Sequence, residues 1–211
     1  MIKIPCSKLE QVRQDPIAYV QQILSENKGG GSHGMFSCFQ DTTRLFHLGE
    51  VGMNEGVKTL QQKFMRFVDN VENRGKQELL LKQFVNYCEE YLKKEFCFVD
   101  GCRNIKWNII EEVTLTGRTP LVVKNHNGLF SYILTERAFN WQTELRFPLI
   151  QSYISTETVR CGSDELNIGV YNVSTSKFDF RNFQTIELTN VINETSNIFK
   201  NVHKEYLKRK K

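Results

Sequence analysis

One histidine stands out among the side chains of this sequence that could do chemistry. His47 lies between Phe46 and Leu48, close to Glu50, just ahead of an expected helix. An imidazole nitrogen is a common metal ligand, so His47 is a candidate ligand, and a structural role in the core is the competing interpretation. The remaining histidines fall in a glycine-rich stretch, a turn and the last helix, where polar side chains are exposed: His33, His126 and His203.

Carboxylates are the second group that could carry chemistry. Glu112 and its neighbouring glutamate lie on one expected strand and therefore point to opposite faces, so only one of them can face a cleft. Glu136 ends a later strand, and Glu144 opens the helical stretch that follows. Metal-dependent phosphodiesterases cluster such carboxylates around the metal. The nearest basic residues in the sequence are Lys124 and Arg137.

Composition favours a globular protein with its positive charge at one end. The chain has 211 residues, of which 40% are hydrophobic and 25% charged, and its formal net charge is +4. Residues 208–211 are all basic, so the rest of the chain is formally neutral: Lys208, Arg209, Lys210 and Lys211. This basic tail could contact nucleic-acid phosphates, or it could be a solvated chain end.

Cysteine usage and hydropathy indicate a reducing compartment. The six cysteines show no Cys-x-x-Cys spacing, which favours free thiols over a disulfide framework. Residues 1–20 lack the apolar region of a signal peptide, and no run approaches the length of a membrane span. We therefore expect a cytoplasmic protein without membrane contact.

Hydrophobic periodicity predicts the elements that would position these side chains. Residues 7–24 form a helical stretch divided at Pro16, residues 28–34 form a mobile glycine-rich loop, and residues 35–49 form a hairpin or a strand. The later elements are helices over 54–72, 76–96, 139–155 and 185–207, and strands over 105–116, 119–124, 129–135 and 166–173. The turn at 125–128 ends in Asn-Gly, the strongest hairpin signal in the chain.

These elements predict the fold class. Residues 1–211 would form a single α/β (α+β) domain with a mainly antiparallel central sheet, flanked by long amphipathic helices.

The order of the parts is similar to that of a known family. His47 precedes a helix, two long helices follow, and a hairpin begins at residues 117–118. A strand then ends in residues 133–137, and the next helix opens with residues 145–150. Over residues 46–173 this order resembles the RecB-type branch of the PD-(D/E)XK nucleases. The resemblance implies a nuclease-like fold and metal-dependent cleavage of DNA or RNA with Mg²⁺ or Mn²⁺.

The motif positions of that family hold other residue types here. The family's turn aspartate, its Asp-x-Lys motif and the glutamine and tyrosine of its helix fall on Pro120, on Thr135-Glu136-Arg137, and on Arg146 and Ile150. Only His47 matches by type. Proline cannot bind a metal ion, and arginine stays protonated and cannot act as a base. The iron–sulfur cysteines of the branch are also absent, because Cys161 stands alone after the helix.

The resemblance therefore implies a retained fold with a degenerate metal site. A shifted site would use His47 and Glu112 as ligands of Mg²⁺ or Mn²⁺, with Glu136, Glu144 and Arg137 serving catalysis. Two classes of function stay open. The chain is either a nucleic-acid-associated, nuclease-like protein that contacts DNA or RNA, or a non-catalytic interaction or scaffolding subunit of a larger protein assembly.

Overall fold

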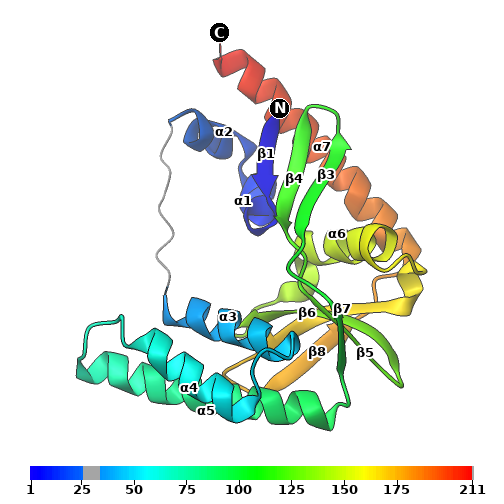
Figure 1. Ribbon diagram of the computed structural model, residues 1–211. Coiled ribbons are helices and arrows are strands. Elements are labelled where there is room, and N and C mark those ends of the chain that lie inside the picture. The colour runs from blue at the N-terminus through cyan, green and yellow to red at the C-terminus, as the bar shows by residue number, and fades with distance from the viewer. Residues whose placement is uncertain (26–33, 211) are drawn as a thin grey trace.

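A computed structural model describes residues 1–25 and 34–210 (Figure 1). Residues 28–33 of the expected glycine loop, and Lys211, lie outside the described residues. The helices are α1 (Leu9–Gln14), α2 (Pro16–Leu24), α3 (Met35–His47), α4 (Met53–Phe64), α5 (Val71–Lys93), α6 (Arg146–Tyr153) and α7 (Thr185–Arg209). The strands are β1 (Ile2–Pro5), β2 (Cys97–Asp100), β3 (Asn104–Ile110), β4 (Val113–Arg118), β5 (Leu121–Asn125), β6 (Gly128–Thr135), β7 (Leu166–Asn172) and β8 (Lys177–Arg181).

The larger of two sheets has five strands in the order β2-β5-β6-β7-β8. The β5–β6 hairpin closes with Asn125 opposite Gly128, as the Asn-Gly step predicts, and Gly128 has a φ of 127° that favours glycine. β6 and β7 are parallel because α6 crosses between them, whereas the other three pairings are antiparallel.

Helices cover both faces of this sheet (Figure 1). Alternate strand residues separate into two buried clusters: Val122, Ile168 and Val170 pack with α6 and α7, while Val123 and Tyr132 pack with α3, α4 and α5. The period of two along the strands therefore directs two different sets of side chains into two cores.

A second sheet has three strands in the order β1-β4-β3. Its inner face carries Ile4, Ile105 and Leu115, which join the same core as Val12 and Val202. α1 and α2 pack against α7 beside this sheet, so residues near the start of the chain lie against its last helix (Figure 1).

The fold is mixed α/β, but the expected mainly antiparallel sheet is wrong. Both sheets are mixed, because β6 pairs parallel with β7 and β1 pairs parallel with β4. The crossover through α6 forces the first pairing. The β1–β4 pairing could not be predicted from the local sequence pattern, because β1 is only four residues long and its partner lies more than a hundred residues along the chain.

Three expected element boundaries are also corrected. Residues 35–47 form α3 and not a hairpin, and α5 runs through Gly75, where we expected a turn. The expected strand 105–116 is a hairpin of β3 and β4 with Glu111 and Glu112 in its turn. By contrast, the division at Pro16 is confirmed, because the Asp15 carboxylate accepts a hydrogen bond from Ala18 N at 2.8 Å and caps α2.

The six cysteines are all free thiols. Cys6, Cys38 and Cys88 are buried, whereas Cys97 and Cys102 are exposed. Among the described residues, no helix has the length and apolar character needed to cross a membrane.

Candidate functional site

The outward face of the three-stranded sheet is polar and basic. Lys3 of β1, Lys106 of β3 and Arg118 of β4 are exposed there and form no ion pair with any described residue. Strand register places Lys3 beside Thr114 and Lys106 beside Thr116. No outward position of these strands is acidic; the positions are occupied by Lys3, Pro5, Asn104, Lys106, Asn108, Thr114, Thr116 and Arg118. We call this surface the basic sheet face.

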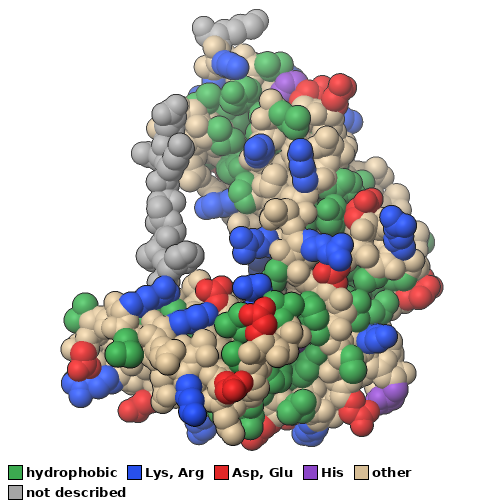
Figure 2. Space-filling view, viewed as in Figure 1, with side chains coloured by type: hydrophobic (Ala, Val, Ile, Leu, Met, Phe, Trp, Pro, Cys, Tyr) green, Lys and Arg blue, Asp and Glu red, His purple; other side chains and the backbone are tan. Residues whose placement is uncertain are grey.

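The basic sheet face continues into a cavity of about 390 Å³ between β4, β6 and α3. We call it the Arg118 cavity; it is lined by Arg44, Arg118, Asp41 and Pro120 among others. Lys106 and Thr116 line the neighbouring depression, and Arg118 follows Thr116 by two positions on β4. Figure 2 shows Lys and Arg side chains gathered around a hollow between the upper sheet and α3.

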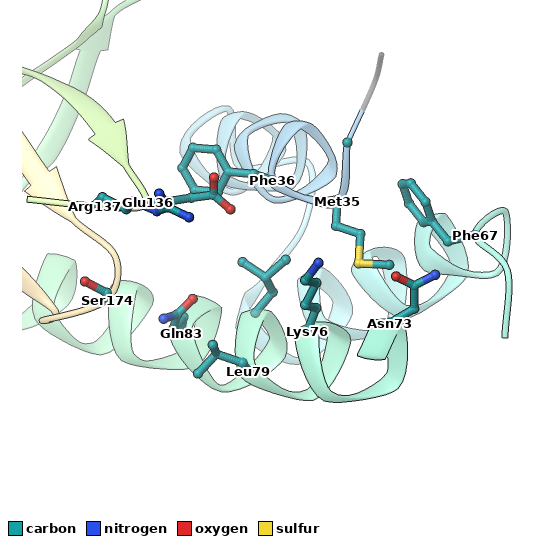
Figure 3. A pocket seen from close by; sticks show the side chains of 12 residues that line it. Met35, Phe36, Phe67, Asn73, Lys76, Leu79, Gln83, Glu136, Arg137 and Ser174 are labelled. Atoms are coloured by element: carbon teal, nitrogen blue, oxygen red, sulfur yellow. The ribbon is translucent and has the colours of Figure 1, made fainter. Parts of the chain in front are cut away.

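A second cavity, of about 530 Å³, lies on the other side of the α3 N-terminus (Figure 3). We call it the Gln83 cavity. Its polar lining comes from α5 and from the segments that follow β6 and β7: Asn73, Lys76, Gln83, Glu136, Arg137 and Ser174. Its apolar lining comes from α3, α5 and the segment after α4: Met35, Phe36, Phe67, Leu79 and Leu80. Ligands of α/β proteins commonly bind beyond the carboxyl ends of parallel strands, and both Glu136 and Ser174 lie at such ends.

Three polar side chains of the Gln83 cavity have no partner among the described residues. Gln83 is only 8% exposed, yet its amide makes no hydrogen bond with any described residue. Glu136 and Arg137 are exposed and likewise form no ion pair or hydrogen bond with described residues. Lys76 is bound to Glu72 at 2.6 Å on the rim. The cavity therefore offers an acid, a cation and an amide that are free to meet a ligand.

His47 lies elsewhere, in an aromatic cluster at the end of α3. Its Nε2 is 2.5 Å from the Tyr87 hydroxyl, which in turn is 2.6 Å from the Tyr132 hydroxyl. The rings of Tyr91 and Phe98 pack against the imidazole. Nδ1 is buried and has no hydrogen-bond partner among the described residues.

Burial keeps His47 neutral. Desolvation lowers the pKa of the imidazole to about 3, far below its ordinary value of 6.5. The hydroxyls of Tyr87 and Tyr132 are also buried, and desolvation raises the pKa of each well above 10. His47 contacts Tyr87, and Tyr87 contacts Tyr132, so the three side chains form a structural hydrogen-bond chain through the core. This agrees with the structural role that competed with a ligand role for His47.

The other carboxylates of the shifted site occupy separate places. Glu112 lies in the β3–β4 turn, where its carbonyl accepts a hydrogen bond from Ile2 N at 2.9 Å. Glu144 is paired with Arg146 at 2.5 Å, and burial raises the pKa of this carboxyl. The described part of the chain contains no group of three His, Cys, Asp or Glu residues that could hold a metal ion. The structure thus brings together only Glu136 and Arg137 of the expected site residues.

The basic tail is largely an extension of α7. The helix runs to Arg209, and Lys208 is bound to Glu205 at 2.6 Å. The Lys210 ammonium lies 5.6 Å from the centre of the Tyr206 ring. Two of the four tail cations therefore already have partners in the helix.

Sequence reasoning missed the cations of the basic sheet face and missed Gln83. Lys106 lies between Ile105 and Trp107, so strand alternation could have assigned it to the solvent face. Gln83 sits beside Phe84 on the buried side of α5. A glutamine within an apolar helical stripe was the available signal.

Comparison with known proteins found neither a matching family model nor a matching curated sequence.

Proposed function

We propose that this chain is a nucleic-acid-binding protein with a nuclease-like fold and a degenerate metal site. The observation that carries the proposal is the basic sheet face: Lys3, Lys106 and Arg118 are exposed and form no ion pair with residues 1–25 or 34–210, and no carboxylate occupies an outward position of β1, β3 or β4. Such a surface attracts phosphates through counterion release. Arg44 extends the positive charge into the Arg118 cavity.

The order of the elements supports the nuclease-like part of the proposal. His47 ends α3, and the two further helices α4 and α5 follow before the strands. Pro120 stands directly before β5, and Thr135 ends β6. α6 then leads into β7, which is the order expected from the RecB-type resemblance.

Binding is favoured over cleavage for this site. Pro120 and Thr135 replace the acidic residues on which the resemblance would place a metal ion. Glu136 faces the Gln83 cavity, and His47 is buried in the aromatic cluster. We therefore expect that any cleavage of DNA or RNA seen with Mg²⁺ or Mn²⁺ persists in at least one of the variants Glu136→Ala and His47→Ala. Cleavage lost in both variants would restore the shifted site.

Salt-dependent binding tests the proposal. Fluorescence anisotropy with a labelled single-stranded oligonucleotide should show affinity falling with salt, with a log–log slope of about −3 for four cations at about −0.7 per contact. The double variant Lys106→Ala/Arg118→Ala should weaken binding about tenfold and make the slope shallower by about 1.4. The matched control Lys82→Ala/Lys177→Ala removes the same charge from α5 and β8, on exposed residues elsewhere. Absence of binding at low salt would reject the proposal.

Three exposed apolar residues close together in the sequence support the second candidate, an interaction subunit. Met65 and Val68 follow α4, Val71 begins α5, and they are 84%, 74% and 83% exposed. Exposed apolar surface often marks protein interfaces. A photocrosslinking residue at position 68 or 71 should capture a discrete partner in cells, whereas one at the isolated exposed residue Ile186 should not. Identical products from all three positions would argue against this interface.

A further inference from the structure

The side chain of Gln83 is largely buried, and its amide reaches the Gln83 cavity. The residue is 8% exposed and makes no hydrogen bond with any described residue. A polar group without a protein partner is satisfied by water or by a ligand. The Gln83 cavity, of about 530 Å³, is within the size range of small-molecule sites. A ligand with hydrogen-bonding edges would supply the missing partner.

The walls of the cavity indicate the shape of that ligand. Phe36 at the start of α3 and Phe67 after α4 contribute aromatic rings, and Met35 of α3 and Leu79 of α5 contribute apolar chains (Figure 3). Phe36 is itself stacked on Phe39, with 5.6 Å between ring centres and an angle of 11° between the rings. Aromatic and apolar walls of this kind accept a flat ring by stacking.

The charges indicate its chemistry. Glu136 can accept hydrogen bonds from an amine, and Arg137, its neighbour in the chain, can contact an anion; neither is engaged by another described residue. These groups can recognise a nucleotide. The Gln83 amide both donates and accepts hydrogen bonds, Glu136 is an acceptor for an exocyclic amine, and Arg137 is a cation for a phosphate.

The Gln83 cavity adjoins the Arg118 cavity along two elements. On α3, Phe36 lines the first cavity, and Arg44 lines the second. Leu134 of β6 lines the Arg118 cavity, and Glu136, directly after the end of β6, lines the Gln83 cavity. A single strand of nucleic acid that lies on the basic sheet face and passes Arg118 would therefore reach the Gln83 cavity.

We propose that the Gln83 cavity holds an unpaired base of a bound single strand. The Gln83 amide and Glu136 would bond to the edge of the base, Phe36 would contact its ring, and Arg137 would contact the adjoining phosphate. This inference rests on the proposed nucleic-acid binding and adds to it a preference for bases that are not paired.

The test compares strands that share phosphates and differ in bases. The full chain is titrated with a labelled single-stranded oligonucleotide, in DNA and RNA versions, with a fully abasic strand of equal length and with the corresponding duplex. Stacking of one base is expected to make the single strand bind about tenfold tighter than the abasic strand. Gln83→Leu and Phe36→Ala should each reduce that advantage severalfold and leave the salt slope unchanged.

Two controls separate recognition from folding. Gln62→Leu makes the same change on the exposed side of α4 and should keep the base preference. The unfolding midpoint of Gln83→Leu should equal or exceed that of the wild type, because the lost amide makes no hydrogen bond within the described part of the chain. Strong destabilisation by Gln83→Leu would assign the residue to the fold and overturn the inference.

The outcomes distinguish the two proposals. Equal, salt-dependent binding of base-containing and abasic strands would overturn the base site and leave nucleic-acid binding standing. Failure to bind any strand at low salt would reject nucleic-acid binding, and the base site with it. A base preference that persists in Gln83→Leu and Phe36→Ala would place base recognition outside this cavity.

Discussion

Nε2 of His47 and the hydroxyl of Tyr87 lie 2.5 Å apart in the buried layer between α3 and α5. The Tyr87 hydroxyl also lies 2.6 Å from the Tyr132 hydroxyl. Tyr87 of α5 therefore links His47 of α3 to Tyr132 of β6 through two hydrogen bonds. His47, Tyr87 and Tyr132 are all buried, so water cannot easily replace a lost hydrogen bond. Loss of this link should therefore lower the free energy of unfolding by a measurable amount.

Tyr87→Phe should lower the free energy of unfolding by about 1–3 kcal/mol, because it removes the partner of both His47 and Tyr132 inside the core. Urea denaturation followed by tryptophan fluorescence measures the change. Tyr153→Phe is the matched control, since its hydroxyl makes no hydrogen bond with a described residue and it should be nearly neutral. Equal stabilities of the two variants would show that the chain of hydroxyls contributes nothing.

Stability should depend on pH through His47. Its folded-state pKa of about 3 lies below the unfolded value of 6.5, so the unfolded chain binds the proton more readily between these values. The contribution is therefore full above about pH 6.5 and decreases as the pH falls towards 3; it amounts to a loss of about 2 kcal/mol between pH 7 and pH 5. Denaturation at both pH values should show a smaller loss in His47→Phe than in the wild type. Parallel losses would mean that other groups cause the acid sensitivity.

Two helical glycines should respond oppositely to alanine. A Cβ at Gly56 would lie 2.6 Å from the buried ring of Phe84, whereas a Cβ at Gly75 would meet nothing within 4 Å. Overpacking of about 1–3 kcal/mol exceeds the helix-propensity gain of about 1 kcal/mol at Gly56. Gly75→Ala should stabilise the protein by about 0.5–1 kcal/mol. Thermal unfolding compares them, and a stabilised Gly56→Ala would contradict the close packing of α4 on α5.

Removal of residues 208–211 should weaken nucleic-acid binding by less than about threefold, compared with about tenfold for Lys106→Ala/Arg118→Ala. Lys208 is already paired with Glu205 and Lys210 lies on Tyr206, whereas the cations of the basic sheet face have no ion-pair partner among the described residues. Anisotropy titrations at one fixed salt concentration provide the comparison. A larger loss of affinity in the truncated chain than in the double variant would show that the tail makes the main contact with nucleic acid.

Long amphipathic elements were predictable because their patterns extend over many turns. α7 and most of α5 follow the expected helices, and β7 matches its apolar run. α3 was missed because its apolar residues were interpreted as two short runs, although Phe36, Phe39 and Phe46 share the helical spacing i, i+3 and i+10. Gly75 did not stop α5 because a glycine on an exposed helix face costs only about 1 kcal/mol, which tertiary packing overrides.

The site was less predictable because it depends on contacts between distant segments. Glu136 and Arg137 were identified from their place at a strand end, and they do line a cavity. Glu112 was assigned to a strand because apolar alternation continues across the β3–β4 turn, although that turn carries it away from His47. Gln83 could not be predicted, because only the folded chain places its amide in a cavity without a hydrogen-bond partner among the residues that the structure describes.

The parallel pairing of β1 with β4 has a consequence for folding during synthesis. Residues 2–5 pair with residues 113–116, and α1 and α2 pack against α7, so these contacts of the early segment wait until the later residues have been made. At about 5–20 residues per second, the apolar side chains of this early segment stay uncovered for several seconds or more on the ribosome. The five-stranded sheet, whose strands all lie within residues 97–181, can assemble before the last helix and provide the surface on which that segment finally settles.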